Sequence, residues 1–531
     1  MSMITATTWV PRGFAAPFPS RYTFNEDEYE RISHLAKLQL DDAKEELEDA
    51  KKDDKENRKR TPGHVADTKT NEEIDDDLKE YDLEHYDDDE EEDEGDTMGM
   101  FGNSKNLVYH NNNEEDPYIT MQGQEEDDDE REELQILATD NLVLAGRIED
   151  EVAHLEVYVY EDEVDNLYVH HDIMLPAIPL AVEWLDMPVG SSNAGKDAKG
   201  NFVAIGTMDP DIELWNLDVV DSMYPDAILG QGAEDAENAE KPKKKKKKKS
   251  KKVNDEFHVD AVLSLAANRQ HRNLLASASA DKTIKLWDLN TTKCAKSYSY
   301  HTDKVSSVVW HPSESTILLS GSYDRTVVAA DMRAPEAKAP RWGVESDVES
   351  VRWNPHDPNY FYISTDNGMI HYHDARNAPA DPSGSKPVWM LQAHDESVSS
   401  FDINPVIPGY LVTGSTDKQV KLWNVQNTGP SMVVSRDLGV GKVFSTTFAP
   451  DQEVGFRLAV AGSKGAVQIW DTSTNAAVRS AFASKVPQLK GDGKERLVGL
   501  DESDTDSDSE EGEDEGAQEG NGGEGWESMD E

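Results

Sequence analysis

Three groups of side chains in this sequence have the residue types that chemistry requires. Gly439-Val440-Gly441-Lys442 resembles half of a phosphate-binding loop, but the upstream glycine is missing and the context is strand rather than strand-to-helix. Histidines cluster at 170–171, beside Asp172, and at His371 and His373, without cysteine or carboxylate companions at metal-ligand spacing. We interpret these histidines as surface residues on strands. With no nucleophile elbow and no paired carboxylates, the sequence predicts a protein that is not an enzyme and uses no cofactor or metal.

Another set of four side chains recurs at a regular spacing. A histidine is followed by a serine or threonine, then by an aspartate in a turn, and finally by a tryptophan. In WD repeats such residues form a hydrogen-bonded chain within one sheet, so we interpret them as structural rather than catalytic. One set is complete, and in a second set Ala330 replaces the tryptophan: His394, Thr413, Asp417 and Trp423, and His301, Ser320 and Asp324.

Short hairpins position these side chains. The clearest is Leu274–Leu289, LLASASADKTIKLWDL, in which two alternating runs flank a polar turn. Similar hairpins cover residues 202–217, 318–332, 363–374, 411–425 and 458–472. Measured at the tryptophan or its equivalent, the steps from Trp287 onward are 43, 43, 50 and 47 residues, which is typical of a four-stranded propeller blade.

A further short strand precedes each hairpin, and the rest of the ring follows from it. This strand, such as Val308–Trp310, often ends shortly before a proline, and we expect it to be the innermost of its blade. Four short apolar runs supply one more unit: Leu134–Thr139, Leu142–Ile148, Leu155–Tyr160 and Leu167–Met174. Counting it gives seven units, within the usual range for a propeller. The sequence therefore predicts an all-β fold, a seven-bladed WD40 β-propeller over residues 131–486.

Acidic arms flank the predicted ring. The formal net charge is −54, of which about −26 falls on residues 1–130 and about −14 on residues 487–531. Such segments cannot bury enough apolar surface to fold alone, so both arms are expected to be largely disordered. The acidity argues against non-specific wrapping of nucleic acid and favours basic partners such as ribosomal proteins or histones.

The N-terminal arm contains two features of its own. Residues 7–22, TTWVPRGFAAPFPSRY, combine dense aromatics with three prolines that prevent a helix. We expect an extended peptide that docks in a groove of a partner through Trp9, Arg12, Phe14, Phe18 and Tyr22; the alternative is a disordered tail. The pattern of residues 25–52 predicts a helix with a modest apolar stripe. This helix either binds a partner or is frayed and solvated.

Two charged segments suggest targeting and modification. The insertion at 230–254 holds seven consecutive lysines, which favour a nuclear-import signal or RNA contact over a solvated linker: Lys243, Lys244, Lys245, Lys246, Lys247, Lys248 and Lys249. In the C-terminal tail the hydroxyls amid acidic residues are candidates for phosphorylation by an acidophilic kinase, against an unmodified tail as the alternative: Ser503, Thr505, Ser507 and Ser509.

The chain resembles the periodic tryptophan protein 1 family. The resemblance lies in the peptide 7–22, the island Leu78–Tyr86 (LKEYDLEHY) and the order of the WD units, and it covers nearly the whole chain. It departs from the family's periodic tryptophans at Ala330 and His373. The resemblance implies a WD-repeat scaffold of the nucleus and nucleolus that binds pre-ribosomal particle proteins and rRNA, supports rRNA processing and is monomeric within a larger complex.

Two other functions remain open from the residues alone. A chromatin or histone-binding platform linked to rDNA transcription would use the acidic runs as histone contacts. A cytosolic signalling adaptor would have little use for the lysine run. No apolar run approaches the roughly 18 residues of a membrane span, and nothing indicates a small-molecule substrate.

Overall fold

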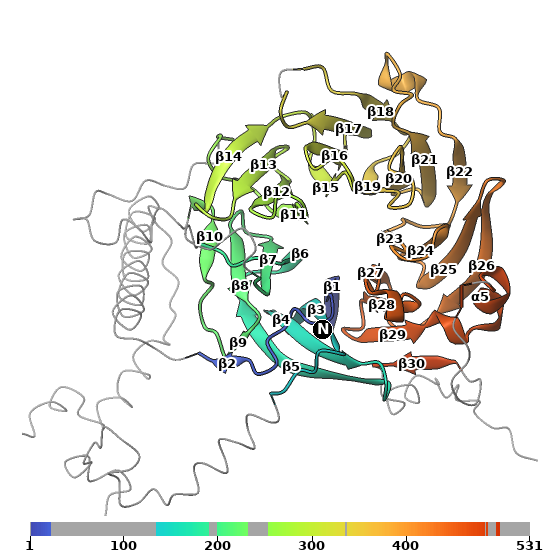
Figure 1. Ribbon diagram of the computed structural model, residues 1–531. Helices are drawn as coiled ribbons and strands as arrows, with labels where there is room; N and C mark the ends of the chain where they lie inside the picture. The colour runs from blue at the N-terminus through green and yellow to red at the C-terminus, as the bar shows by residue number, and fades with distance from the viewer. Residues whose placement is uncertain are drawn as a thin grey trace, which may run out of the picture. The chain divides into compact units, whose positions relative to one another are not determined.

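Seven four-stranded sheets stand around a common centre in the computed structural model (Figure 1). The structure describes residues 2–22, 134–190, 199–231, 253–334, 337–483, 485–486 and 495–499, which belong to one compact unit. Each sheet is antiparallel, and its first strand lies nearest the centre. The predicted seven-bladed propeller is confirmed.

The strands are grouped here by blade, from the centre outward. Blade 1 contains β1 (Ser2–Val10), β3 (Asn141–Glu149), β4 (Val152–Glu161) and β5 (Asn166–Leu175). Blade 2 contains β6 (Pro179–Leu185), β7 (Phe202–Thr207), β8 (Ile212–Asn216) and β10 (Ala227–Leu229). Blade 3 contains β11 (Val262–Ala267), β12 (Leu274–Ser279), β13 (Ile284–Asp288) and β14 (Lys293–Tyr298). Blade 4 contains β15 (Val305–Trp310), β16 (Ile317–Ser322), β17 (Thr326–Asp331) and β18 (Arg341–Gly343).

The remaining blades follow the same order. Blade 5 contains β19 (Val348–Trp353), β20 (Tyr360–Thr365), β21 (Met369–Asp374) and β22 (Trp389–Gln392). Blade 6 contains β23 (Ser400–Ile403), β24 (Tyr410–Gly414), β25 (Gln419–Gln426) and β26 (Gly429–Asp437). Blade 7 contains β27 (Val443–Phe448), β28 (Arg457–Gly462), β29 (Val467–Asp471) and β30 (Arg496–Val498). Between and beyond these strands, the described residues also form one parallel pair, β2 (Ser20–Arg21) with β9 (Val219–Val220), and four short helices, η3 (Pro382–Gly384), η4 (Gln452–Val454), η5 (Thr472–Thr474) and α5 (Ala476–Ala481).

The predicted limits of the ring are wrong at both ends. The run Leu134–Thr139 was expected to be a strand, but it forms none; β1 from the N-terminus takes the innermost place in blade 1 instead. Ser2–Val10 therefore belongs to the ring and not to an arm ending at residue 130. At the other end, β30 extends blade 7 beyond the predicted limit at residue 486.

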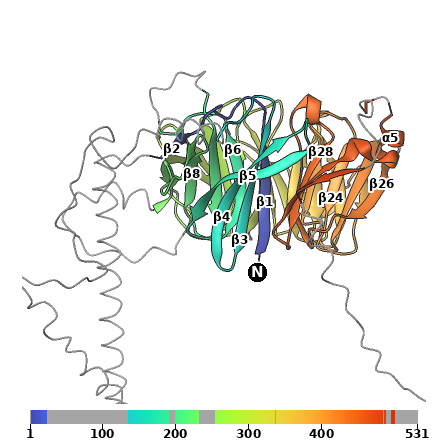
Figure 2. The same ribbon diagram turned by 90° about the horizontal axis from the view of Figure 1, so that it is seen from below.

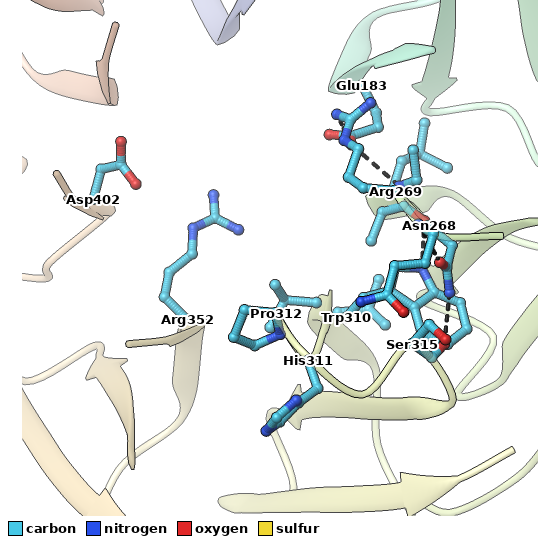
Figure 3. Close-up of a pocket in the computed structure, with 15 residues that line it drawn as sticks. Glu183, Asn268, Arg269, Trp310, His311, Pro312, Ser315, Arg352 and Asp402 are labelled. Carbon is cyan, nitrogen blue, oxygen red and sulfur yellow. Dashed lines mark hydrogen bonds and ion pairs between the residues drawn. The ribbon is translucent and has the colours of Figure 1, made fainter. Parts of the chain in front are cut away.

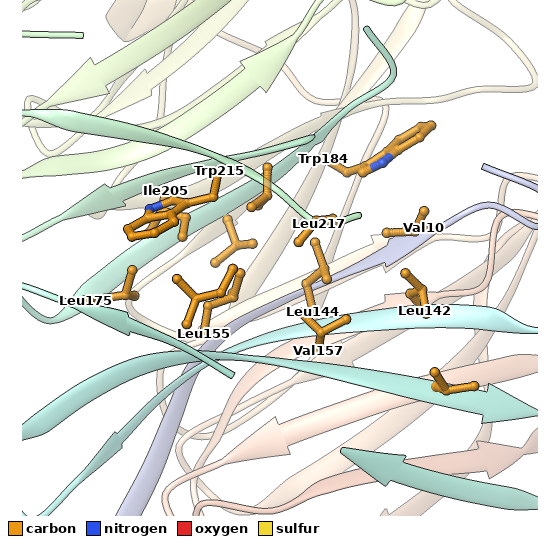
Figure 4. Close-up of a cluster of buried hydrophobic side chains, with 14 of the residues drawn as sticks. Val10, Leu142, Leu144, Leu155, Val157, Leu175, Trp184, Ile205, Trp215 and Leu217 are labelled. Atoms are coloured by element: carbon orange, nitrogen blue, oxygen red, sulfur yellow. The ribbon is translucent and has the colours of Figure 1, made fainter. Parts of the chain in front are cut away.

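The core lies between neighbouring blades, because each sheet buries both faces against the next. Figure 4 shows one such cluster, where Val10 of β1 packs near Leu142 and Leu144 of the same blade and Trp184 and Trp215 of blade 2. Most of these side chains are fully buried. The N-terminal strand thus contributes to the first core cluster of the ring.

The two faces of the ring differ in the loops they carry (Figure 2). We call the face with the loops between the first and second strands of each blade the AB face, and the opposite face the DA face. The strand β1 begins at the DA face, where the label N lies in Figure 2, and ends at the AB face. Among the described residues no helix has the length and apolar character to cross a membrane, and in the same ranges no cluster of three or more potential ligands could hold a metal ion.

Candidate binding site at the ring closure and the channel mouth

The N-terminal strand β1 joins the first blade to the last. It pairs with β3 of its own blade, from Ser2 opposite Glu149 to Val10 opposite Leu142. On its other side it faces β27 of blade 7, where the amide of Thr7 donates to Ser445 Oγ at 3.1 Å. Neither blade contributes a strand to the other's sheet, so side-chain contacts close the ring.

The closing contacts repeat those of an ordinary junction between blades. Between blades 3 and 4, the amide of Val308 donates to Ser264 Oγ at 3.2 Å and Trp310 Nε1 donates to the carbonyl of Ala266 at 2.9 Å. At the closure, Trp9 Nε1 donates to the carbonyl of Thr447 at 3.1 Å. This bond and the Thr7 amide bond to Ser445 lie at the same register positions as the two bonds between blades 3 and 4. The segment TTWV is therefore a regular innermost strand.

Arg12 fixes the chain where β1 ends at the AB face. Its amide donates to Asp451 Oδ2 at 3.1 Å and its Nε to Asn141 Oδ1 at 2.8 Å. Asn141 donates in turn to Asp451 Oδ2 at 2.7 Å, and Arg12 Nη1 pairs with Glu453 at 2.7 Å. This network spans blades 1 and 7 and adds polar bonds to the closure.

The rest of the predicted docking peptide crosses blades 1 and 2 of its own ring. Phe14 meets the indole of Trp184 edge-on, with ring centroids 4.7 Å apart, and the amide of Ala16 donates to Asp218 Oδ1 at 2.9 Å. Ser20 and Arg21 then form β2 beside β9. The groove occupied by this peptide thus belongs to the same chain.

The five predicted partner-binding residues differ in what remains accessible. Trp9 is buried and its indole is hydrogen-bonded, while Arg12, Phe14 and Tyr22 are half-buried. Phe18 alone among the five is classed as exposed, at 39%. Of these five residues, Phe18 therefore keeps the most exposed surface, whereas Trp9 is covered by the ring.

Hydrogen-bonded sets built on a histidine tie the strands of blades 3, 4 and 6 together, as the spacing predicts for the last two. In blade 6, His394 bonds Asp417 Oδ2 and Thr413 Oγ1, both at 2.8 Å, and Trp423 Nε1 donates to Thr413 at 2.9 Å. In blade 4, His301 makes the corresponding two bonds. Ala330 stands at the tryptophan position and has no side-chain donor for Ser320. Blade 3 has a complete tetrad that the spacing analysis left out: His258, Ser277, Asp281 and Trp287.

The tetrad also sets the charge of its acid. Burial alone would raise the pKa of Asp281, but hydrogen bonds from His258 and Thr283 outweigh it and lower that pKa to about 2. Burial holds the pKa of His258 below its ordinary value. The carboxylate therefore stays ionised at neutral pH and keeps its bonds to the turn.

Blade 5 contains aromatic stacking in place of a tetrad. His373 occupies the position that tryptophan has in other blades, and its ring stacks on Phe361 with centroids 5.5 Å apart. The ring of His371 stacks on that of His373, with centroids 6.2 Å apart. Both histidines are buried, as is His171, whereas His170 is half-buried, so the interpretation as surface residues is wrong for His171, His371 and His373. They occupy inward-facing strand positions, and burial lowers the pKa values of His171 and His373 to about 4.

A channel runs between the innermost strands, and its AB mouth forms a cavity of about 320 Å³. Figure 3 shows Arg352 reaching into open space between Asp402 on one side and the pair Glu183–Arg269 on the other. Glu183 Oε1 accepts bonds from Arg269 Nη2 at 3.0 Å and from the amide of Ala267 at 3.1 Å. Burial raises the pKa of Asp402, and the charge of Arg352 partly offsets this effect.

Hydrogen bonds also link the AB loops from blade to blade. In each case a side chain of one loop donates to a main-chain carbonyl of the next blade, at 2.6–3.0 Å: Asn268 to Ser315, His311 to Pro358, His356 to Asn404, and Asn404 to Gly455. Together with the Arg12 network they brace the AB face from blade 3 to the closure. The AB face is thus a fixed platform around the channel mouth.

Comparison with known proteins places this architecture. The WD domain, G-beta repeat family matches residues 251–288, 292–328 and 385–424. Periodic tryptophan protein 1 of Saccharomyces cerevisiae is 41% identical over 94% of this chain and 93% of its own length. The chain belongs to the periodic tryptophan protein 1 family. An uncharacterized WD repeat-containing protein of Schizosaccharomyces pombe is 51% identical over 94% and 95% of the two chains, and the Drosophila melanogaster homolog of periodic tryptophan protein 1 is 30% identical over 91% and 96%.

In this member of the periodic tryptophan protein 1 family, tryptophans recur at two places in the blade. One set ends the innermost strands: Trp9, Trp184, Trp310 and Trp353. The other lies on the third strands: Trp215, Trp287, Trp423 and Trp470. Trp9 belongs to the first set only because the N-terminal segment is a strand of the ring.

Several predicted sites of this family member lie outside the described residues. They are the helix 25–52, the acidic runs, the lysines 243–249 and the tail hydroxyls Ser503, Thr505, Ser507 and Ser509. The described ends of the lysine insertion are anchored at the DA face. The amide of Gln231 donates to Asp211 Oδ1 at 2.8 Å, and the buried amine of Lys285 donates to the carbonyl of Asn254 at 2.6 Å.

Residues that the sequence did not single out make up much of the site. Asn141 and Asp451 hold Arg12, and Arg352 stands alone in the channel mouth. The sequence does contain a periodic signal for Arg352. It lies two residues after Ser350 in its innermost strand, and in the next blade Asp402 lies two residues after Ser400. Asn141 and Asp451 carry no such periodic signal.

Proposed function

We propose that the protein is a non-catalytic scaffold in ribosome biogenesis, as its resemblance to the periodic tryptophan protein 1 family implies. It would bind large-subunit precursors, assembly factors and rRNA in the nucleolus and support rRNA processing. The observation that carries the proposal is family membership along the chain: the yeast relative covers 94% of it, well beyond the matched WD repeats.

The geometry supports a scaffold in physical terms. The closure network and the braced AB loops hold the ring in one shape, so that partners meet a preformed surface at little ordering cost. The arms add a further net charge of about −40 to this platform. Peptide motifs on such arms raise the local concentration of several partners at once.

Purification with crosslinked RNA tests the function. We would express the full tagged chain in a fungal host, irradiate the cells, purify the complex from nuclear extract and sequence the bound RNA. The proposal predicts large-subunit rRNA precursors and assembly factors. Recovery of nucleosomes without ribosomal precursors would instead support the chromatin-binding alternative, which the acidic arms favour because histones are basic.

Localisation tests the lysine run separately. Replacing Lys243–Lys249 by glutamine keeps the length of the insertion but removes seven positive charges. We expect reduced nuclear accumulation if the run is an import signal. As a matched control, glutamine at Lys282, Lys418 and Lys464, which lie in exposed turns of the ring, should leave localisation unchanged. Equal nuclear levels in both variants would contradict the targeting role.

Phe18 offers a point test of partner binding by the N-terminal peptide. Its side chain is 39% exposed at the AB face, while Trp9 and Phe14 hold the ring. Phe18→Ala should release at least one partner and lower the melting temperature less than Trp9→Ala does. An unaltered set of purified partners would contradict a binding role for this residue.

A further inference from the structure

The AB mouth of the channel contains a cation that forms no hydrogen bond and no ion pair with another described residue. Arg352 lies two residues after Ser350 in its innermost strand, and the equivalent positions hold Glu183 in blade 2 and Asp402 in blade 6. Its guanidinium reaches into the cavity, with Asp402 on one side and the pair Glu183–Arg269 on the other (Figure 3). It also borders the adjoining cavity of about 410 Å³ further along the channel.

The two carboxylates at the same level are engaged differently. Glu183 is paired with Arg269 and with the amide of Ala267. Asp402 uses Oδ2 to accept the amide of Phe448 at 2.9 Å. The donor fork of Arg352 and the carboxylate of Asp402 are therefore the two groups that face the open mouth.

This pair has a defined chemical complement. A guanidinium offers a planar fork of donors that matches a carboxylate or phosphate with two parallel bonds. The oxygen of Asp402 can accept a main-chain N–H. An extended peptide with an acidic side chain supplies both groups at once, and a mouth of about 320 Å³ has room for a side chain but not for a nucleic-acid helix.

We propose that the AB mouth of the channel is a binding site for an acidic peptide, with its oxyanion on Arg352 and a neighbouring amide on Asp402. The net charge of −54 opposes polyanions at a distance. Since screening confines exposed charges to about 8 Å at physiological salt, the local cation still governs contact. This site is independent of the proposed role in ribosome biogenesis.

The test measures binding of a fluorescein-labelled, capped hexaglutamate peptide to the full chain by fluorescence anisotropy. We expect saturable binding, weakened about tenfold or more by Arg352→Gln, since charge-assisted paired bonds are the strong ones. Arg352→Lys keeps the positive charge and loses the paired donors of the guanidinium, so its affinity for the peptide should lie between those of the wild type and Arg352→Gln. Asp402→Asn, which keeps an acceptor for Phe448 but loses the oxygen offered to the peptide amide, should also weaken binding.

The control is Lys464→Gln, an equal change of charge in an exposed turn of the DA face, which should bind as the wild type does. Melting temperatures would establish that each variant is folded. A phosphoserine peptide that binds more tightly than hexaglutamate, still through Arg352, would support the site with phosphate as the oxyanion. No saturable binding, equal binding by Arg352→Gln, equal binding of hexaglutamine, or binding of hexauridylate in place of the peptide would each overturn the proposal.

Discussion

Trp9 Nε1 donates a hydrogen bond to the carbonyl oxygen of Thr447, 3.1 Å away and 438 residues further along the chain. This bond joins the first strand of the protein to the innermost strand of its last blade. Because no sheet mixes strands of blades 1 and 7, the ring depends here on side chains rather than on a shared ladder. The N-terminal segment is therefore part of the scaffold.

Removing the indole should weaken the ring. Trp9 is 6% exposed, and Trp9→Ala would open a cavity and delete the bond to Thr447, with an expected loss of about 3–5 kcal/mol in the free energy of unfolding. Urea denaturation followed by tryptophan fluorescence and circular dichroism measures it. Phe18→Ala, in the same segment, removes a residue that is 39% exposed and should cost clearly less than Trp9→Ala, and equal effects of the two would contradict this assignment.

The histidine tetrads predict a contrast between blades 6 and 5. Asp417→Ala removes the acceptor of His394 and of the amide of Gln419 and should cost about 2–3 kcal/mol. In the equivalent turn residue of blade 5, Asn367, the side chain accepts one bond, from Thr365, among the described residues. Its main-chain carbonyl, which accepts from Gln392, stays in place on mutation, so Asn367→Ala should cost under about 1 kcal/mol. Thermal melts of both variants would decide, and a larger loss for Asn367→Ala would contradict the contrast.

Glu213 should make the protein less stable as pH rises. Burial raises its pKa from 4.5 to about 7 in the folded state, although the bond from Trp215 Nε1 opposes the shift. The folded chain therefore holds this proton more tightly than the unfolded chain, and its stability declines between pH 4.5 and 7. Glu213→Gln keeps an acceptor for Trp215 and should be more stable than the wild type by about 2–3 kcal/mol at pH 8.

The stability difference for Glu213→Gln has to depend on pH if its cause is the carboxylate. Urea titrations at pH 5 and pH 8 measure this dependence. If Glu213→Gln gained the same stability at pH 5 and at pH 8, the gain would come from packing and not from the carboxylate.

His373 should give the opposite slope in acid. Burial, with a smaller effect of His371, lowers its pKa from 6.5 to about 4. The unfolded chain takes up this proton first, so stability is full above pH 6.5 and falls as pH drops toward 4. His373→Phe retains a ring against Phe361 and should remove about 2–3 kcal/mol of that loss. If the free energy of unfolding fell equally in the variant and the wild type from pH 7 to 4, the loss in acid would not come from His373.

The blades could be predicted because their determinants are local. Each hairpin carries its alternation, its turn and its tryptophan within about 16 residues, as Leu274–Leu289 does. The tetrads followed from their fixed spacing. The buried histidines were within reach too, since His373 stands at the tryptophan position and therefore on the inward face.

The ring closure could not be predicted in the same way. Residues 11–140 separate β1 from its partner β3, and Thr7 meets Ser445 only when the ring is complete. Alternation marks Ile4 and Trp9 as strand residues, but it cannot say which of seven blades they join. Arg352 was missed for a similar reason, because its lack of a partner depends on side chains from neighbouring blades.

The most direct test of the closure is amide hydrogen exchange on the intact chain at neutral pH. We predict that the amides of residues 6–10 are as strongly protected as those of β15, because both strands hold the same register between two blades. Exchange of this segment within seconds, at the rate of a free peptide, while β15 stays protected, would contradict a ring closed by its own N-terminus.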